Sequence, residues 1–289
     1  MMPNTKPKQS KLTQDNNTPI SNQAHTEPDT RQSYAQKMWV AFITLTVKEI
    51  KRILRIWPQT LLPPAITMSL YFIIFGKMIG SRVGEMGGVP YMQFIVPGLV
   101  MMAVITNSYS NVASSFFSTK FQGSVEEMLV SPISKHTMIL GFVAGGLFRG
   151  LGVGLIVTLL ALFFTKLSVV NLFITLFTLM MTSALFSLAG MINAVFAKSF
   201  DDISIIPSFV LTPLTYLGGV FYSLDGLSPF WQTLSLANPI VYMVNAFRYG
   251  ILGYSDVNVF YSLIAIFLFT IVFYFIAYYL LKDGKRIRL

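Results

Sequence analysis

The chain has 289 residues, of which 54% are hydrophobic and only 11% charged, and its formal net charge is +9. A soluble domain of this size carries about 25% charged residues, so most of this surface is expected to face lipid in an all-α membrane protein. Without cysteine, disulfides and thiolate metal sites are excluded, and two histidines are too few for a histidine metal centre. The basic residues stand beside apolar segments, which indicates membrane topology rather than a nucleic-acid partner.

Residues 1–33 are rich in Asn, Gln, Thr, Pro and Lys. They hold too little apolar surface to fold, so we expect a disordered cytoplasmic tail. The segment also lacks an apolar core of the length that a cleavable signal peptide needs, and no such peptide is predicted.

Residues 34–57 have the pattern of an amphipathic helix. One side is basic, and the opposite side is apolar: Lys48, Lys51, Arg52 and Arg55 against Trp39, Phe42, Ile43, Val47, Ile50, Ile53, Leu54 and Trp57. This pattern predicts a helix that lies in the membrane interface, with its basic face toward anionic headgroups. Pro58 is expected to end it.

Residues 58–289 are expected to form one transmembrane domain of six helical spans, each about 20 apolar residues long or more. The third and fourth exceed one bilayer thickness, so they are expected to tilt or project into water. The predicted spans are Leu61–Ile79, Tyr91–Ala113, Thr137–Phe164, Val169–Ala197, Ile203–Tyr222 and Val257–Leu281.

The orientation follows from the basic residues that flank these spans, because Lys and Arg accumulate on the cytoplasmic side. One side holds Lys48, Lys51, Arg52, Arg55, Lys120, Lys135, Lys198, Lys282, Lys285, Arg286 and Arg288, and the other only Lys77, Arg82, Lys166 and Arg248. Both termini and the loop 116–136 are therefore expected in the cytoplasm.

The loop 116–136 is a polar interruption between long apolar stretches. A short amphipathic helix is predicted here, and as a coupling helix for a soluble partner it would use Glu126, Glu127, Met128, Leu129, Val130, Ser131 and Pro132. The acids would meet a basic rim, and Met128, Leu129 and Val130 would enter a groove of the partner. An ordinary loop helix that rests on lipid is the open alternative.

Arg149 lies about 18 Å into the third predicted span, at about 1.5 Å per helical residue. A charge at that depth is costly, so it is expected to face the bundle interior or a polar cavity. It is either a pathway or inter-subunit residue, or part of a buried structural pair. No acid lies within the spans away from their ends, so carbonyls, Asn or a partner chain would satisfy it.

Around Arg149, Gly146, Gly150 and Gly154 form two overlapping GxxxG steps. Small residues at this spacing let helix backbones approach closely, so close packing is predicted, with a hinge as the alternative. Asp201 and Asp202 precede the fifth predicted span, where an N-cap is favoured over a metal or proton site.

The segment 227–253 is apolar but broken by proline, which predicts two short re-entrant or capping helices on the outer side, separated at Asn238-Pro239. An outer gate is one interpretation, and an interfacial aromatic belt is the other. The residues proposed for the gate are Trp231, Asn238, Pro239, Tyr242, Asn245 and Arg248.

Motifs for chemistry are missing from the chain: there is no GxxxxGK[ST], HExxH, GxSxG or intramembrane carboxylate pair. The chain is therefore not expected to be an enzyme, and a transporter of this composition would need energy from another polypeptide.

Three runs resemble the membrane subunit of bacterial ATP-binding cassette exporters of the type-2 permease family. They are GSVEEMLVSPISKHTMILGFVAGGLFRGLGVG (123–154), FAKSFDDISIIPSFVLTPLTYLGGVFYSL (196–224) and PFWQTLSLANPIVYMVNAFRYGILG (229–253). The similarity covers about residues 35–285, and it looks closest to small inner-membrane permeases that pair with a separate ATPase. The longer polar N-terminus departs from the family pattern.

The resemblance implies a six-span permease that assembles as a dimer with two cytoplasmic ATPase subunits, which hold ATP and Mg. It also implies export from the cytoplasm across a bacterial inner membrane. By motif match, Glu126 to Pro132 would be the coupling helix, and Tyr34–Trp57 the interface helix.

Two other classes of function remain open. A membrane-embedded lipid-modifying enzyme or assembly scaffold would use surface acids and histidine, for which only Asp201, Asp202 and His136 are available. A secondary transporter is less favoured, because no internal repeat of spans and no mid-membrane carboxylate is present.

Overall fold

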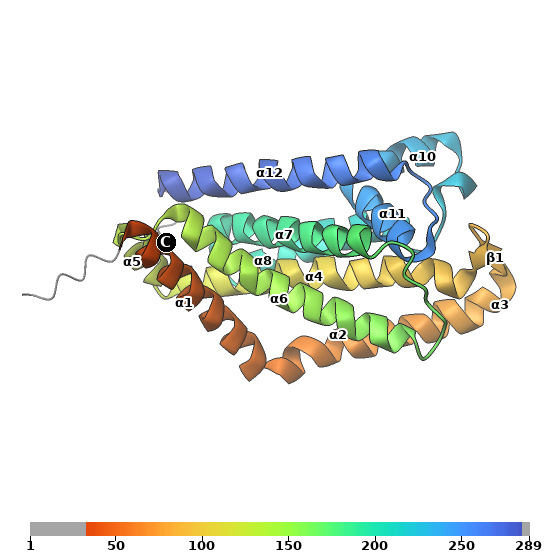
Figure 1. The fold of residues 1–289 in the computed structure, drawn as a ribbon, viewed down its shortest axis with the longest axis horizontal. Helices are drawn as coiled ribbons and strands as arrows, with labels where there is room; N and C mark the ends of the chain where they lie inside the picture. Colours follow the sequence, from red (N-terminus) through yellow and green to blue (C-terminus); the bar gives the residue numbers. More distant parts are fainter. Residues whose placement is uncertain (1–32, 285–289) are drawn as a thin grey trace, which may run out of the picture.

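The computed structural model describes residues 33–284, which are almost wholly helical (Figure 1). The predicted tail, apart from Ser33, and the basic residues 285–288 lie outside the described residues. Within this part of the chain, five helical runs are long and apolar enough to cross a membrane. They are the run Trp57–Val83, α4 (Tyr91–Phe121), α6 (Lys135–Ala161), α7 (Leu172–Phe196) and α12 (Val259–Asp283).

The first of these runs changes its geometry along its length, from α2 (Trp57–Tyr71) through a π-helical segment (Phe72–Ile79) to α3 (Gly80–Val83). The second is longer than the sequence predicts, because α4 continues past Ala113 into the polar loop and takes Lys120 with it.

The fifth predicted span is shorter and less regular than the others. Residues 202–216 are helical, as α8 (Asp202–Ile206), a π-helical segment (Pro207–Leu211) and α9 (Thr212–Tyr216). Proline has no N–H group for the helical ladder, and here the N–H of Thr212 reaches back five residues to the Pro207 carbonyl. Turns follow α9, so this run is not among the five that length and composition identify.

The N-terminal helix α1 (Tyr34–Arg55) runs obliquely to the bundle (Figure 1). Its side chains Leu45, Glu49 and Ile53 are buried. A Cβ on Gly145 of α6 would lie 2.6 Å from the Glu49 Cβ, so the two helices are in close contact. The sequence predicted only a basic and an apolar face, whereas α1 also has a face that packs on protein.

Helix α4 is buried along most of its length and packs between α6, α7 and α11 (Pro239–Leu252). A glycine of α7 permits one of these contacts: a Cβ on Gly190 would lie 2.4 Å from the Tyr109 carbonyl oxygen of α4. A second, smaller hydrophobic cluster surrounds Phe116 and Phe117 at the far end of α4, where α5 (Ser124–Val130) begins.

The two ends of the bundle differ in structure (Figure 1). One end carries α5, the start of α1 and the end of α12. The other carries α10 (Pro229–Leu236), a 3₁₀ turn (Leu224–Gly226) and a hairpin of β1 (Glu85–Met86) and β2 (Val89–Pro90). The sequence did not predict the hairpin. The predicted break between two short helices occurs at Asn238, whose side chain accepts from the Ile240 N–H at 3.0 Å and so begins α11.

Candidate functional site

Helix α5 presents a small surface with two acids. Glu126, Glu127 and Val130 are exposed, and Val130 is 87% exposed. In contrast, Met128 and Leu129 pack partly against the chain's own core near Phe116. The sequence predicted that both would enter a partner's groove; the structure places them toward the interior, because a seven-residue helix needs apolar contacts of its own to stay folded. We call Glu126, Glu127 and Val130 the α5 surface.

The helix is held on a rigid junction. Gly123, with φ of +76°, makes the sharp turn between α4 and α5 that other residues rarely adopt. Val125 is fully buried beneath α5. Ser131 ends the helix, and its hydroxyl donates to the Met128 carbonyl at 2.8 Å, while Pro132 follows as an exposed residue.

Lys120 lies at the end of α4, where the sequence counted it as a cytoplasmic surface charge. Instead it is buried, and its Nζ donates to the carbonyls of Val195 at 2.7 Å and Ala197 at 2.8 Å. These carbonyls end α7, where a cation is stabilised by the negative end of the helix dipole. The contact fastens the base of α5 to α7.

Asp201, which precedes α8, and Asp202, its first residue, do not form the cap that the sequence predicted. Asp201 makes no side-chain capping bond. The Asp202 carboxylate accepts from the backbone N–H groups of Lys198 (2.8 Å) and Ser199 (3.1 Å), which precede it. These bonds hold the pKa of Asp202 below its ordinary value of 3.8.

His136, the other candidate of the enzyme alternative, has partners of its own. Its Nδ1 pairs with the Tyr274 hydroxyl, and its ring stacks on Tyr278 with centroids 4.5 Å apart. In the part of the chain that the structure describes, no three His, Asp or Glu side chains gather as a metal site.

A buried group of polar residues joins three helices near the middle of α6. We call it the inner polar cluster: Glu49 and Arg52 of α1, Asn107, Asn111 and Ser115 of α4, and Arg149 of α6. It contains the sequence candidate Arg149, whose Nη2 donates to Asn107 Oδ1 at 3.1 Å. An Asn side chain was one of the partners that the sequence allowed.

Glu49 is the acid at the centre of this cluster. It is 1% exposed, pairs with Arg52 at 3.0 Å and accepts from the Ser115 hydroxyl at 2.7 Å. Arg52 also donates to the Asn111 Oδ1 at 2.8 Å, so it turns into the bundle and not toward headgroups as the sequence predicted. The guanidinium finds a carboxylate and an amide there, which hydrocarbon cannot offer. In the sequence, the one signal for this buried pair was Glu49, a single acid in an otherwise basic helix.

Not every donor in the cluster has an acceptor. Arg149 Nε and Asn111 Nδ2 are buried without a hydrogen-bond partner among the described residues. A buried donor left in this state costs about 1–3 kcal/mol. The inner polar cluster is therefore incompletely satisfied.

The three glycines of α6 lie where that helix meets its neighbours. A Cβ on Gly150 would come within 2.0 Å of the Ser108 Oγ, and on Gly146 within 2.0 Å of the Ser187 Oγ. At Gly154 the nearest atom, on Val104, would be 2.8 Å away. All three positions thus lie in close helix contacts, which leave little room for a larger side chain.

Arg248, a candidate of the predicted outer gate, is fully buried. Its Nη2 donates to the Gly219 carbonyl at 2.6 Å, its guanidinium lies 3.9 Å from the Phe94 ring centre, and it pairs with Asp256 at 3.5 Å. Asp256 was not predicted, because it lies in the short loop before α12, where an acid looks like ordinary solvent-facing sequence.

Asp256 in turn binds several groups near the end of α11. It accepts from the hydroxyls of Ser223 (2.5 Å) and Tyr254 (2.6 Å), and its N–H donates to Asn245 Oδ1 at 2.9 Å. We call Arg248, Asp256, Ser223, Tyr254 and Asn245 the outer polar cluster. It ties α11 to the loops that precede α10 and α12.

The other residues of the predicted gate lie apart from this cluster. Trp231 is half exposed on α10, and the Tyr242 hydroxyl donates to the Leu236 carbonyl at 2.8 Å. Asn238 donates to the Leu214 carbonyl at 2.6 Å, with Pro239 beside it. The structure brings Asn245 and Arg248 together but does not gather all six residues around one opening.

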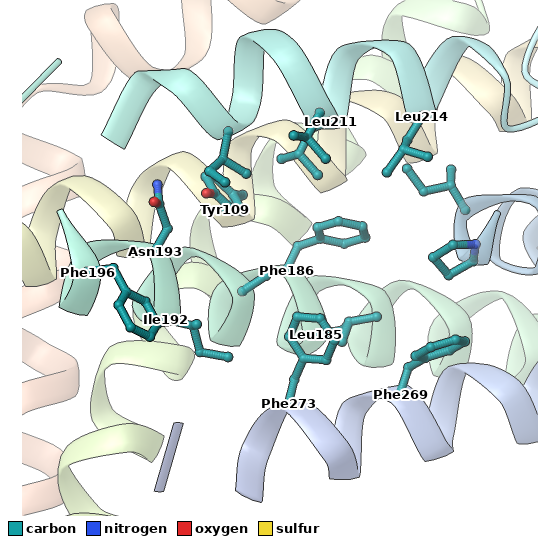
Figure 2. Close-up of a pocket in the computed structure, with 15 residues that line it drawn as sticks. Tyr109, Leu185, Phe186, Ile192, Asn193, Phe196, Leu211, Leu214, Phe269 and Phe273 are labelled. Atoms are coloured by element: carbon teal, nitrogen blue, oxygen red, sulfur yellow. The ribbon is translucent and has the colours of Figure 1, made fainter. Parts of the chain in front are cut away.

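A cavity of about 560 Å³ lies between α7, α9, α11 and α12 (Figure 2). Its walls are apolar except for Tyr109 and Asn193 at one end. Of its lining residues only Pro239 was a site candidate in the sequence, for the outer gate, since Phe, Leu and Ile on membrane helices carry no signal for a pocket.

Comparison with known proteins gives two kinds of match. Residues 40–252 match the family model of the ABC-2 type transporter. The chain is 58% identical over 250 residues to the inner membrane transport permease YadH of Escherichia coli K12, which covers 86% of this chain and 98% of that protein. It is 26% identical over 218 residues to nodulation protein J of Rhizobium leguminosarum bv. trifolii, covering 74% and 82%. The matched residues include α5 and the inner polar cluster.

Proposed function

Because the chain belongs to the ABC-2 type transporter family, we propose that it forms the membrane pathway of an ATP-driven exporter. As a transmembrane permease of this family it is a multi-pass protein of the inner membrane. The proposal adds the direction of transport, two cytoplasmic ATPase subunits that bind ATP and Mg, and a second copy of this chain.

The α5 surface carries the proposal. Its two acids and Val130 are exposed at the end of the bundle where α1 begins and α12 ends (Figure 1). We assign this end to the cytoplasm, which agrees with the excess of Lys and Arg beside it. The helical run 202–216 would then serve as a sixth, irregular crossing, so that both termini lie on the same side.

The way α5 is anchored supports a mechanical role. A force on the α5 surface would be transmitted to α4 through buried Val125 and the Gly123 turn. The bonds from Lys120 to the end of α7 would transmit the same force to a second helix. ATP shifts the permease only as far as the closed ATPase pair binds one arrangement of α5 better than the other. Coupling therefore requires that α5 moves as one body with α4.

One face of α4 supports assembly with a second copy. Thr106 is exposed, and Ser110, Ser114 and Ser118 are half-buried at four-residue intervals, which places them on one stripe. The neighbouring helices α2 and α9 meet through the hydroxyls of Tyr71 and Tyr216 at 2.8 Å. Polar stripes inside a membrane face protein or a water-filled path, so a two-fold partner would close this face into the export route.

The first test is affinity purification of the tagged chain from its own membranes in mild detergent, with mass spectrometry and an ATP hydrolysis assay. We expect a stoichiometric ATP-binding subunit and ATPase activity. Both should be lost when Glu126→Lys and Glu127→Lys are combined, because the reversed charges repel a basic rim. Glu85→Lys on the exposed outer hairpin is the matched control and should retain the subunit.

Two outcomes would contradict the proposal. If the subunit stays bound to the double variant with full activity, the α5 surface is not the docking site. If a folded preparation contains no ATP-binding subunit at all, the chain has no energy source, and the enzyme or scaffold alternative takes precedence. Of the three side chains available to that alternative, His136 and Asp202 already have hydrogen-bond partners within the chain.

A further inference from the structure

We call the cavity beside Tyr109 the Tyr109 cavity. It reaches from the side of the bundle, between α12 and the run 202–216, into the core (Figure 2). At its rim, Val210 is 43% and Phe269 is 37% exposed, whereas Tyr109 and Ile240 on its inner wall are fully buried. Helix α12 is long and apolar enough to cross a membrane, and the run 202–216 is the sixth crossing proposed above, so we expect their exposed side chains to face hydrocarbon. The cavity is therefore open to lipid.

A volume of about 560 Å³ falls within the range of about 300–1,000 Å³ that small-molecule sites have. Such a space, lined by Phe, Leu and Ile, does not hold water, because a buried water needs several polar partners. If it stayed empty, its walls would lose their dispersion contacts. The medium that can fill it is the hydrocarbon on which it opens.

The cavity has one polar end. The Tyr109 hydroxyl is buried and points toward the Asn193 amide without a hydrogen bond of normal geometry (Figure 2). Asn193 Nδ2 is already used, since it donates to the Ile203 carbonyl at 3.2 Å. The hydroxyl is thus a donor that an occupant with an acceptor oxygen would satisfy.

This polar end lies on the α5 side of the bundle. Asn193 is near the end of α7 at Phe196, whereas Leu214 and Pro239 line the opposite, wholly apolar part of the cavity. The cavity extends between them along the bundle (Figure 2). Its polarity matches a lipid chain whose oxygen atoms lie at the membrane surface and whose methyl end lies near the bilayer centre.

We propose that the Tyr109 cavity holds one acyl chain of a membrane phospholipid, with an ester carbonyl oxygen near the Tyr109 hydroxyl. The lipid belongs to the leaflet on the α5 side. That this is the cytoplasmic leaflet rests on the orientation proposed above. Binding of the chain itself requires neither the ATPase nor transport, so the two proposals can fail separately.

Photo-crosslinking in vesicles tests the site. The purified chain is reconstituted in phosphatidylethanolamine and phosphatidylglycerol, with a phosphatidylethanolamine that carries a diazirine at the methyl end of one acyl chain. We expect labels concentrated near Leu214, Pro239 and Phe269. A diazirine next to the ester should instead label the region of Ile192 and Asn193.

Variants that fill the cavity make the test specific. Leu214→Trp and Ala189→Trp enter from opposite walls, and each should lower this labelling at least about tenfold, since overpacking is costly. The control is Leu155→Trp on α6, a residue that is 61% exposed. This variant should leave labelling of the cavity unchanged. Tyr109→Phe should lower labelling about fivefold, because it removes one hydrogen-bond donor.

The proposal is overturned if α2 and α6 are labelled as strongly as the cavity. Such labelling would show that lipid surrounds the bundle without a preferred site in the cavity. It is also overturned if the cavity positions keep their labels in both tryptophan variants, with folding checked by a monodisperse elution peak. If only one tryptophan variant folds, that variant and Tyr109→Phe still decide the outcome.

Discussion

The two polar clusters hold buried arginines in different ways. In the outer polar cluster, Arg248 and Asp256 lie eight residues apart in the chain and are both fully buried. The carboxylate accepts from two hydroxyls and a backbone N–H. In the inner polar cluster, Arg149 and Glu49 come from helices far apart in sequence, and Arg149 Nε and Asn111 Nδ2 have no acceptor.

This difference indicates which end of the molecule is built to stay fixed. In the outer cluster Arg248 faces a fully buried carboxylate, and although its Nη1 makes no hydrogen bond within the described residues, separating the two charges is expensive, because each would be left buried and unpaired. In the inner cluster Arg149 is held by a hydrogen bond to the neutral Asn107 amide, and this bond can be exchanged at a lower cost than a buried charge pair. We therefore interpret the outer end as a static cap, and the contact of α1 with α4 and α6 as the part that can rearrange when α5 moves.

Breaking the outer pair should have the largest effect. Asp256→Asn leaves Arg248 without its carboxylate in a fully buried site, and we expect a loss of about 3–5 kcal/mol in the free energy of unfolding. Thermal unfolding of the purified chain in detergent measures it. The double replacement Arg248→Met with Asp256→Leu should recover part of the loss. An unchanged midpoint for Asp256→Asn would show that the outer cluster is not a cap.

Breaking the inner pair should cost less stability and more function. In Glu49→Gln, Arg52 keeps both oxygens of Asn111 as acceptors, so we expect a loss of about 2–3 kcal/mol. In the variant assembled with its ATPase, we expect less transport per ATP hydrolysed, even at temperatures where the variant remains folded. Lys51→Gln, an exposed change on the same helix, serves as the control. A stability loss as large as that of Asp256→Asn would remove the distinction between the clusters.

The smallest effect is expected from the packing around α6. A Cβ at Gly150 would meet two serine hydroxyls that can rotate away, so Gly150→Ala should cost only about 1 kcal/mol. Gly152→Ala is the matched control, since nothing lies within 4 Å of its Cβ position. It should be neutral or stabilise the helix by up to about 1 kcal/mol. Equal midpoints for the two variants would argue against close packing at Gly150.

Much of the fold follows from local patterns in the sequence. The long apolar stretches predict four of the crossing helices to within a few residues at each end, whereas α4 continues eight residues past its predicted end, from Ala113 to Phe121, and its last turns bury Lys120. The prolines at 207 and 213 give the fifth predicted span its irregular geometry. Hydrophobic periodicity does not reveal which run departs from regular α-helical hydrogen bonding, because the irregular run is as apolar as a regular helix.

The α5 surface, too, was predicted from the sequence only in part. Glu126 and Glu127 are exposed as their charge requires. Met128 and Leu129 were assigned to a partner, but nothing in a seven-residue pattern distinguishes a partner's groove from the chain's own core. The coupling role of the helix stays a prediction until a partner is isolated.

The sequence by itself determined the apolar helices and their order, the polar segment at α5 and the break at Asn238, because each depends on residues close together in the chain. Only the tertiary structure decided that Arg52 turns inward, that Arg248 pairs with Asp256, and that an apolar cavity ends at Tyr109. These features depend on which helix faces meet. A buried charge takes whatever partner packing brings within reach, and that partner can stand anywhere in the sequence.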